Sequence, residues 1–280
     1  MKSLIADSGA TKTDWCLIKG NEILKHYSGK GISPVFQTED QISNEIHNNV
    51  FPEFKEWNIS KIHFYGSGCT AENIPIVKNA IFKIFPIETI EVYSDLIAAA
   101  HSLCGHKPGI ACILGTGSNS CEWDGNRIIN QISPLGFILG DEGSGAYIGK
   151  KLIGDALKNQ LTPGLKELLL DEYELTPSII IDKVYRQPFP SRFLASLSPF
   201  ISKHLDDESI RQIVINSFND FFKRNIMQYN FSEKSVNFVG SIAWYYSDIL
   251  KETAQLNGII TGKILKSPMI GLIEYYSKTL

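Results

Sequence analysis

Short runs of apolar residues alternate with polar turns at the start of the chain, which is typical of β-strands. They predict strands over residues 4–6, 15–19 and 22–27, with Gly20-Asn21 as a two-residue hairpin turn. Apolar residues then recur at every fourth position, which predicts a helix over 39–57. The same reasoning predicts a strand at 61–65, a helix at 71–85, a strand at 89–93 and a helix at 96–103. The first hundred residues therefore predict the order βββαβαβα.

The second part of the chain begins with the same order. Strands are expected at 110–114, 120–123 and 127–132, with Asp124-Gly125-Asn126 as a hairpin turn, followed by a helix at 145–159. A mostly helical stretch over 163–229 is interpreted as an insertion. A strand at 236–239, a helix at 242–256, a strand at 259–261 and a helix at 268–278 complete the series.

This duplication predicts an α/β protein with mixed central sheets and two lobes, residues 1–104 and 105–280. The boundary lies in the polar, turn-rich segment Cys104-Gly105-His106-Lys107-Pro108-Gly109. The last helix, taken as 268–280 in this division, could pack against the first lobe. No repeat of fixed period is visible in the sequence.

Charge and composition narrow the class of partner. The 280 residues are 43% apolar and 20% charged, and 27 Lys and Arg face 30 Asp and Glu. Without a basic excess, a nucleic acid or an acidic membrane surface is not expected, and a small molecule is favoured as the partner. The five cysteines are odd in number and show no C-x-x-C spacing, so reduced core thiols are predicted. A signal peptide or membrane span is not expected, which favours the cytoplasm.

Two glycine-rich turns each follow a predicted strand, and together they indicate a phosphate clamp. The first is Asp7-Ser8-Gly9-Ala10-Thr11-Lys12-Thr13-Asp14, and the second is Gly115-Thr116-Gly117-Ser118-Asn119. Small residues let backbone N–H groups approach an anion closely, and the hydroxyls of Thr and Ser add donors. A single turn of this kind would more often be only a turn.

Five segments carry a resemblance to a known family. They are Asp7 to Asp14, Tyr93-Ser94-Asp95, Gly115 to Asn119, Leu135 to Ser144 with its core Gly140-Asp141-Glu142-Gly143-Ser144, and Val239-Gly240-Ser241-Ile242-Ala243. In order and spacing they resemble the N-acetylglucosamine kinase family of actin-like sugar-kinase ATPases. The chain is also similar to a sister group, the ATPase activators of benzoyl-CoA reductases and hydroxyacyl-CoA dehydratases. The resemblance runs through the whole chain and is weakest between residues 163 and 229.

The resemblance implies two RNase H-like lobes that close over a cleft holding Mg²⁺-ATP, with the sugar near the hinge. Asp7, at the end of the first strand, is expected to hold Mg²⁺ directly or through water. The β- and γ-phosphates are expected on the two turns; the first contributes Gly9, Thr11, Lys12 and Thr13, and the second Gly115, Thr116, Gly117 and Ser118. The plainer alternatives are that Asp7 only caps a turn and that Lys12 is only solvated.

Asp95 follows a predicted strand and precedes a helix, and it matches the family's catalytic aspartate. Phosphoryl transfer needs a carboxylate that accepts the proton of the attacking hydroxyl, so Asp95 is expected to be the general base. The alternative is an ordinary helix cap. Capping is also the alternative for Asp141, which lies beside Glu142 before a helix.

The resemblance assigns further residues to the two ligands. Sugar contacts are implied for Ser33, Asp95, Thr116, Asn119, Gly136 and Asp141, and Gly240 and Ser241 are implied to approach the adenosine. Ser33-Pro34 replaces an asparagine that is common in this family, and Ser8 replaces a frequent glycine. Asn119 as a turn residue and Ser241 as a helix cap are the plainer interpretations.

The predicted function is ATP-dependent phosphorylation of an amino sugar, N-acetylglucosamine at its 6-hydroxyl. N-acetylmuramic acid and glucosamine are close variants. A dehydratase-activating ATPase with a [4Fe–4S] cluster is a second hypothesis, which would need ligands such as Cys104 and Cys112. A non-catalytic actin-like ATP-binding scaffold is a third. Analogy to relatives leaves a homodimer through the second lobe open.

Overall fold

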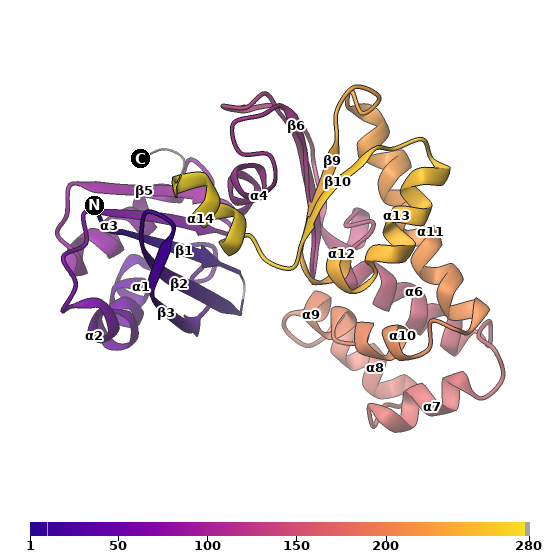
Figure 1. The fold of residues 1–280 in the computed structure, drawn as a ribbon. Coiled ribbons are helices and arrows are strands. Elements are labelled where there is room, and N and C mark those ends of the chain that lie inside the picture. Colours follow the sequence, from indigo (N-terminus) through magenta and orange to yellow (C-terminus); the bar gives the residue numbers. More distant parts are fainter. Residues whose placement is uncertain (10, 278–280) are drawn as a thin grey trace. The chain divides into compact units, whose positions relative to one another are not determined.

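The computed structural model describes residues 1–9 and 11–277, which fall into two compact units (Figure 1). The first unit comprises residues 1–106 and the C-terminal segment from Ser267, and the second comprises residues 107–266. The chain thus leaves the first unit at His106 and returns to it at Ser267. The end of the last predicted helix, from residue 278, lies outside the described residues.

The first unit is built on a five-stranded sheet of order β3-β2-β1-β4-β5. Its strands are β1 Ser3–Ser8, β2 Lys12–Lys19, β3 Glu22–Lys30, β4 Lys61–Gly66 and β5 Thr89–Ser94. The first three strands form an antiparallel meander, whereas β1, β4 and β5 run parallel. Because parallel strands end at the same sheet edge, the residues that follow β1, β4 and β5 lie together there.

Helices cover both faces of this sheet because its strands are apolar on both sides. One face packs on α1 Glu39–Glu45, the π-helix η1 Ile46–Val50, α2 Phe51–Phe54 and α3 Ile74–Ile84. The other face packs on α4 Asp95–Leu103 and on α14 Met269–Ser277. The helix predicted over 39–57 extends over residues 39–54, and it contains a π-turn that the apolar spacing did not predict. Pro52 has no N–H and its ring would meet the carbonyl of Asn48, so the helix widens into a π-turn at that point.

The second unit repeats the strand order of the first, since its sheet reads β8-β7-β6-β9-β10. The strands are β6 Gly109–Leu114, β7 Ser118–Trp123, β8 Ile128–Ile132, β9 Val236–Val239 and β10 Thr261–Leu265. The short helix α5 Gly136–Leu139 and then α6 Gly145–Leu157 follow β8, and α12 Ser241–Tyr245 and α13 Ser247–Leu256 lie between β9 and β10. The predicted α/β class, with mixed sheets and a duplicated order, is confirmed.

Two predictions for this region were wrong. The strand expected at 259–261 begins only at Thr261, because Gly258 and Ile259 close a Schellman motif at the end of α13. Their N–H groups donate to the carbonyls of Gln255 and Ala254, and Gly258 has φ +69°. The single helix expected over 242–256 divides at Tyr246, whose hydroxyl donates to the carbonyl oxygen of Ser198 at 2.6 Å.

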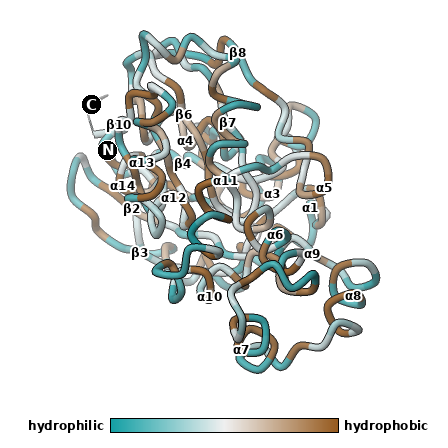
Figure 2. The backbone as a smooth tube through the Cα atoms, turned by 90° about the vertical axis from the view of Figure 1, so that its right-hand side faces the viewer, coloured by the Kyte–Doolittle hydropathy of each residue, from teal (hydrophilic) through white to brown (hydrophobic). Residues whose placement is uncertain are grey.

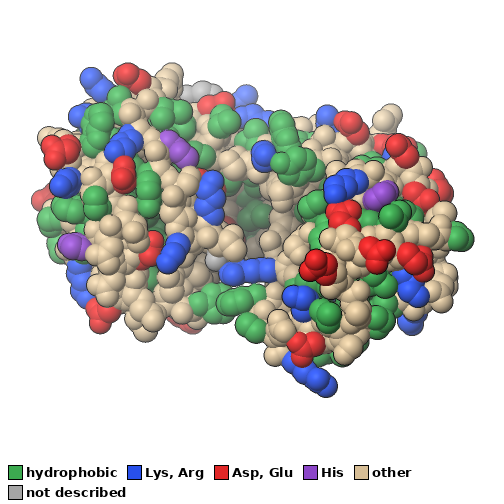
Figure 3. Space-filling view, turned by 90° about the horizontal axis from the view of Figure 1, so that it is seen from below, with side chains coloured by type: hydrophobic (Ala, Val, Ile, Leu, Met, Phe, Trp, Pro, Cys, Tyr) green, Lys and Arg blue, Asp and Glu red, His purple; other side chains and the backbone are tan. Residues whose placement is uncertain are grey.

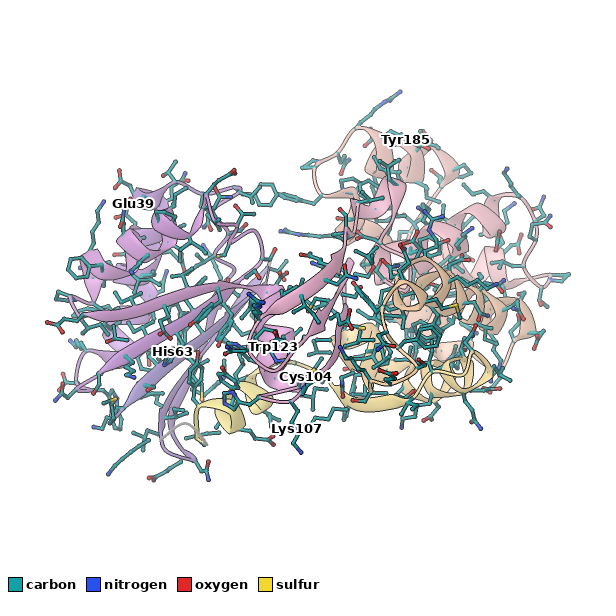
Figure 4. All side chains as sticks on the ribbon, turned by 90° about the horizontal axis from the view of Figure 1, so that it is seen from above. Glu39, His63, Cys104, Lys107, Trp123 and Tyr185 are labelled. Carbon is teal, nitrogen blue, oxygen red and sulfur yellow. The ribbon has the colours of Figure 1, made fainter. Side chains whose placement is uncertain are left out.

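The predicted insertion is a set of helices attached to one face of the second sheet. They are α7 Leu165–Glu172, α8 Pro177–Tyr185, α9 Pro190–Ala195, α10 Ser198–Lys203, α11 Glu208–Arg224 and the 3₁₀ turn η2 Ile226–Gln228. Figure 2 shows hydrophobic and hydrophilic segments alternating along α7 and α8, as expected for amphipathic helices. The exposed side chain of Tyr185 extends from the end of α8 (Figure 4). Within the described residues, none of the helices is long and apolar enough to cross a membrane.

Candidate functional site

Two aspartates lie at the carboxyl edge of the first sheet. In register, Asp7 of β1 is level with Tyr65 of β4 and Tyr93 of β5. Asp95 comes one residue after β5 ends, as the first residue of α4. On the antiparallel side, Asp7 faces Asp14 of β2. The sheet therefore brings two predicted site residues, Asp7 and Asp95, to one edge.

The pKa values of both carboxyl groups are raised. The pKa of Asp7 is raised to about 7, mainly by burial and also by the charges of Asp14 and Asp95, while Lys12 opposes the shift. Burial raises the pKa of Asp95 to about 6, although backbone N–H groups at the start of α4 partly counteract it. Raised pKa values in one place are typical of functional sites.

Asp95 is not the N-cap residue of α4. The N-cap of α4 is Ser94, whose hydroxyl accepts the N–H of Ile97 at 3.4 Å. Asp95 is the next residue, half-buried, and its carboxylate accepts backbone N–H groups of the first turn. A carboxylate at a helix start is stabilised by the helix dipole, and this one also remains partly reachable by water.

The oxygen atoms at this sheet edge are suitable ligands for a hard cation, which would bind through the carboxylate of Asp7. Asp7 and its neighbours offer oxygen atoms, the ligands that Mg²⁺ prefers, and the crowding of negative charge that raises the pKa of Asp7 would be relieved by a cation. In the described part of the chain, no group of three or more His, Cys, Asp or Glu side chains is arranged to hold a metal. Mg²⁺ usually keeps several waters and is held in proteins by one or two carboxylates together with substrate phosphates.

The first glycine-rich turn joins β1 and β2. The N–H of Gly9 donates to the carbonyl of Lys12 at 2.9 Å, so the turn closes on itself. Thr11 and Lys12 are exposed, and the ammonium of Lys12 lies 2.8 Å from Asp14. Thr13, which was also expected to reach phosphate, is fully buried instead. Its hydroxyl donates inward to the carbonyl of Lys30 or to the hydroxyl of Ser8.

Ser8 explains why a serine fits where the family often has glycine. Its hydroxyl accepts the N–H of Ile32 at 2.9 Å and lies 2.9 Å from the carbonyl oxygen of the same residue. It also lies 2.7 Å from the hydroxyl of Thr13. This buried network fixes the end of β1 to the segment after β3, next to the turn. Sequence reasoning did not assign a role to Ser8, although its small polar side chain in an apolar strand was a usable signal.

Ser33 begins a tight loop at the same end of the first sheet. Its N–H donates to the side chain of Gln37 at 2.8 Å, and its hydroxyl donates to the carbonyl of Ser67 at 3.4 Å. Ser67 in turn donates its N–H to the carbonyl of Ser8, which joins this loop to the β1 edge. The Ser33 side chain is buried, whereas Phe36 in the same loop is 66% exposed.

The second glycine-rich turn joins β6 and β7 and has the same internal closure. The N–H of Gly115 donates to the carbonyl of Gly117 at 3.0 Å. The first two N–H groups of α6, those of Gly145 and Ala146, donate to the carbonyls of Gly115 and Thr116. Thr116 is exposed at the tip of the turn. These hydrogen bonds hold the turn against the start of α6 and leave Thr116 exposed at its tip.

Asp141 lies against this second turn. Its carboxylate accepts the N–H of Ser118 at 3.3 Å, and a Cβ on Gly117 would be only 3.0 Å from one of its oxygens. Burial raises the pKa of Asp141, and the charge of Glu142 adds to the rise. Neither Asp141 nor Glu142 occupies the N-cap position of α6, which is Ser144.

Two other predicted sugar residues, Asn119 and Gly136, also lie in the second unit. Asn119 lies on β7, where its side-chain oxygen accepts the N–H of Ser120 at 2.9 Å and the amide of Gln131 at 3.3 Å. Its amide nitrogen is thus the group left to donate. Gly136 begins α5 with φ +74°, and the ammonium of Lys150 donates to the carbonyl of Phe137, which fixes that short helix. Sequence reasoning did not identify Lys150.

Gly240 connects β9 to α12 and approaches the end of β6. It has φ +125°, and a Cβ at this position would lie 2.3 Å from the carbonyl oxygen of Leu114. Only glycine fits there. Gly240 occupies the N-cap position of α12 without a side-chain cap, and Ser241 follows as the exposed first helical residue.

A cavity of about 420 Å³ opens beside Ser241 in the second unit. It is lined from α12 and its end by Ser241, Ile242, Tyr245 and Tyr246, and from α10 by Ser198, Pro199, Ser202 and Lys203. Sequence reasoning missed the α10 wall, because the insertion carries no motif and its helices were placed only as a group.

In the part of the chain that the structure describes, no cysteine belongs to a group of three or more potential metal ligands. Cys112 lies in β6 and packs in the hydrophobic core of the second unit, and Cys104 is half-buried at the end of α4 in the first unit (Figure 4). Cys16, Cys69 and Cys121 are also buried.

The chain is similar to solved structures of sugar kinases. One is a candidate N-acetylglucosamine kinase of Porphyromonas gingivalis, with 46% identity, a TM-score of 0.96 and 98% of each chain covered. Another is a candidate N-acetylglucosamine kinase of Chromobacterium violaceum, with 15% identity, a TM-score of 0.73 and 98% of each chain covered. A ROK family glucokinase of Streptomyces griseus, in complex with glucose and AMPPNP, matches at 16% identity and a TM-score of 0.59, again over 98% of each chain. No protein-family model and no curated protein sequence matches the chain.

Proposed function

Because the chain belongs to the N-acetylglucosamine kinase family of actin-like sugar-kinase ATPases, we propose that it transfers the γ-phosphoryl group of ATP to an amino sugar. We propose N-acetylglucosamine as the acceptor and its 6-hydroxyl as the attacking group. The observation that carries this proposal is the half-buried Asp95 carboxylate, which lies at the same sheet edge as Asp7 and the first glycine-rich turn.

Asp95 is the proposed general base. With a pKa of about 6 it is mostly ionised at neutral pH, and it is a stronger proton acceptor than an ordinary aspartate. The sugar hydroxyl loses its proton to the Asp95 carboxylate as its oxygen bonds to the γ-phosphorus. The bond between the γ-phosphorus and the bridging oxygen breaks, and ADP leaves with that oxygen.

Asp7 is the proposed ligand of Mg²⁺, directly or through a water molecule. When bound, the ion would neutralise negative charge on the phosphates. The residues of the chain hold the ligand groups in place. Asp7 is held inside β1 by pairing on both sides, so its carboxylate is fixed before ATP arrives.

The exposed parts of the two turns are the proposed phosphate contacts. In each turn the N–H of the first glycine, Gly9 or Gly115, is used for internal closure. The proposed donors to phosphate are therefore the backbone N–H groups of residues later in each turn. These are Thr11 and Lys12 in the first turn, and Thr116 and Gly117 in the second. Ser118 is less available, because its N–H already donates to Asp141.

The cavity beside Ser241 is the proposed adenosine site. Its volume of about 420 Å³ lies in the range of small-molecule sites, and Tyr245 and Tyr246 add aromatic surface. Gly240 brings the backbone of this site against the end of β6, next to the second glycine-rich turn. A nucleotide with its base at Ser241 would have its phosphates toward Gly115.

The proposed sugar contacts are Asp141, the amide of Asn119, and the backbone around Thr116 and Gly136 in the second unit, with Ser33 in the first. A carboxylate beside an amide offers both an acceptor and donors, as sugar hydroxyls and an acetamido group require. The glucokinase of Streptomyces griseus, which has the same fold, was solved with glucose and AMPPNP bound. A sugar and a nucleotide on this fold support the proposal.

Surface charge is consistent with a small acceptor. On the face seen in Figure 3, acidic and basic side chains are interspersed with hydrophobic ones, and the net charge is −3. A polyanionic partner would favour a basic field.

The test is ADP release with Mg²⁺-ATP over a panel of N-acetylglucosamine, N-acetylmuramic acid, glucosamine, N-acetylmannosamine and glucose. We expect turnover with N-acetylglucosamine to exceed that with the other sugars, and we expect Asp95→Asn to lower it at least a hundredfold, the size of a lost general base. Slow ATP hydrolysis that does not depend on any sugar would overturn the proposal in favour of an activator or a scaffold.

A further inference from the structure

We propose that helix α11 of the insertion positions the Asp141 carboxylate through Ser217 and Arg224. This inference rests on the proposed function, because Asp141 is a proposed sugar ligand. Ser217 and Arg224 are assigned as positioning residues, since neither is placed against a ligand. The inference gives the helical insertion a role in the sugar site.

The turn that carries Asp141 is in a strained conformation. Asp141 has φ +57° and Gly143 has φ +77°, and the N–H of Ser144 donates back to the carbonyl of Asp141 at 3.1 Å. A left-handed aspartate is unfavourable, so the surrounding structure must hold it in place. This turn decides where the Asp141 carboxylate lies against Gly117.

One face of α11 holds that turn at two successive residues. The hydroxyl of Ser217 accepts the N–H of Gly143 at 3.1 Å, and both groups are buried. Seven residues, or about two turns, further along α11, the guanidinium of Arg224 donates to the buried carboxylate of Glu142 at 2.5 Å. Residues seven apart lie on the same face of a helix, so the two contacts form one line along α11.

Two more contacts extend the same face. The side chain of Phe221 packs closely against Gly143. A Cβ added to Gly143 would lie only 3.0 Å from the Cβ of Phe221, so the turn fits tightly against the helix. The hydroxyl of Tyr147, in the first turn of α6, donates to Asp220 of α11 at 2.7 Å. The segment from Glu142 to Tyr147 is therefore held by α11 along its length.

Each contact is expected to matter for a separate physical reason. Without the Ser217 hydroxyl, the buried N–H of Gly143 loses its acceptor, and the turn can gain a new one only by moving. Without Arg224, the buried charge of Glu142 loses its partner and is driven toward water. Both changes displace Asp141, which is their immediate neighbour in the chain.

The experiment compares Ser217→Ala and Arg224→Met with Arg211→Met as the matched control. Arg211 lies on the same helix and is also ion-paired, but with Glu252, away from the Asp141 turn. The first readout is the KM for N-acetylglucosamine and for ATP. We expect the sugar KM to rise about tenfold in the two test variants with a much smaller change in kcat, and Arg224→Lys to restore part of the loss.

The second readout does not need activity. Hydrogen–deuterium exchange, measured by mass spectrometry on peptides covering residues 140–147, should be at least tenfold faster in Ser217→Ala and Arg224→Met than in wild type, and unchanged in Arg211→Met. If Ser217→Ala does not fold, Arg224→Met decides alone.

The outcomes separate this inference from the proposed function. A wild-type protein that phosphorylates none of the sugars overturns the proposed function, and exchange at 140–147 then still decides whether α11 holds the turn. An active wild type whose sugar KM is unchanged in the test variants overturns the positioning role alone. Equal effects from Arg211→Met would also overturn it, since the helix would then act only through general stability.

Discussion

Replacing Asp95 with asparagine is expected to make the protein more stable at pH 8 while it removes the activity. Burial raises the pKa of Asp95 from its ordinary 3.8 to about 6, so the native state disfavours the ionised form. At full ionisation this rise corresponds to about 3 kcal/mol of lost stability. Because the side chain is only half-buried and water screens part of the effect, about 1–2 kcal/mol should be measured.

The pH dependence of this difference gives the sharper test. Above pH 6 Asp95 is ionised in both the folded and the unfolded state, and the full cost is present. As the pH falls from 6 toward 3.8, the folded state takes up the proton first, so the cost disappears. The stability advantage of Asp95→Asn should therefore be largest at pH 8 and close to zero near pH 4.

Urea unfolding of the metal-free protein at pH 8, 6 and 4.5 measures this difference. The matched control is Asp248→Asn, an exposed aspartate in the first turn of α13, which should change stability by less than about 0.5 kcal/mol. If Asp95→Asn were less stable than wild type at pH 8, or if its advantage did not vary with pH, the assignment of Asp95 as a desolvated carboxylate would be refuted.

Three further predictions follow from single residues. Gly240→Ala should raise the KM for ATP at least tenfold, because its Cβ would overlap a backbone carbonyl. The control Gly258→Ala, which also has a positive φ but lies in open space, should leave that KM unchanged. Equal effects of the two substitutions would contradict the packing argument. Asp7→Asn should raise the Mg²⁺ concentration for half-maximal activity about tenfold; an unchanged Mg²⁺ titration would remove Asp7 as the ligand. Ser8→Ala should cost about 1–3 kcal/mol in urea unfolding, since buried backbone groups lose their partner, and a loss below about 0.5 kcal/mol would disprove the network.

Local patterns in the sequence predicted most of the elements, and the errors have physical causes. The duplicated strand order followed from alternation of apolar and polar residues and from the hairpin turns at Gly20 and Gly125. Ile259 was predicted to lie in a strand, because an apolar residue before a polar run is a common feature of strands. In the structure it is the hydrophobic residue that closes a helix C-terminus after Gly258. Pattern alone does not separate these two uses of an isoleucine.

The positions of candidate site residues could be predicted where they follow a strand, and less well where packing decides. Asp7 and Asp95 each follow a predicted apolar strand in the sequence, and the sheet brings both to one edge. The inward direction of Thr13 depends on its pairing with Ser8, which the sequence does not reveal. The contacts of α11 with the Asp141 turn join residues more than seventy positions apart, so no local pattern could predict them.

Identification of the product is the decisive experiment for the proposed kinase activity. Wild-type protein would be incubated with Mg²⁺, N-acetylglucosamine and ATP carrying a labelled γ-phosphate, and the product analysed by mass spectrometry and by ³¹P and ¹³C nuclear magnetic resonance. We expect N-acetylglucosamine 6-phosphate that contains the label, formed in equal amount to ADP and absent with Asp95→Asn. Label found only in inorganic phosphate, with the sugar recovered unchanged, would show that the protein hydrolyses ATP and does not phosphorylate this sugar.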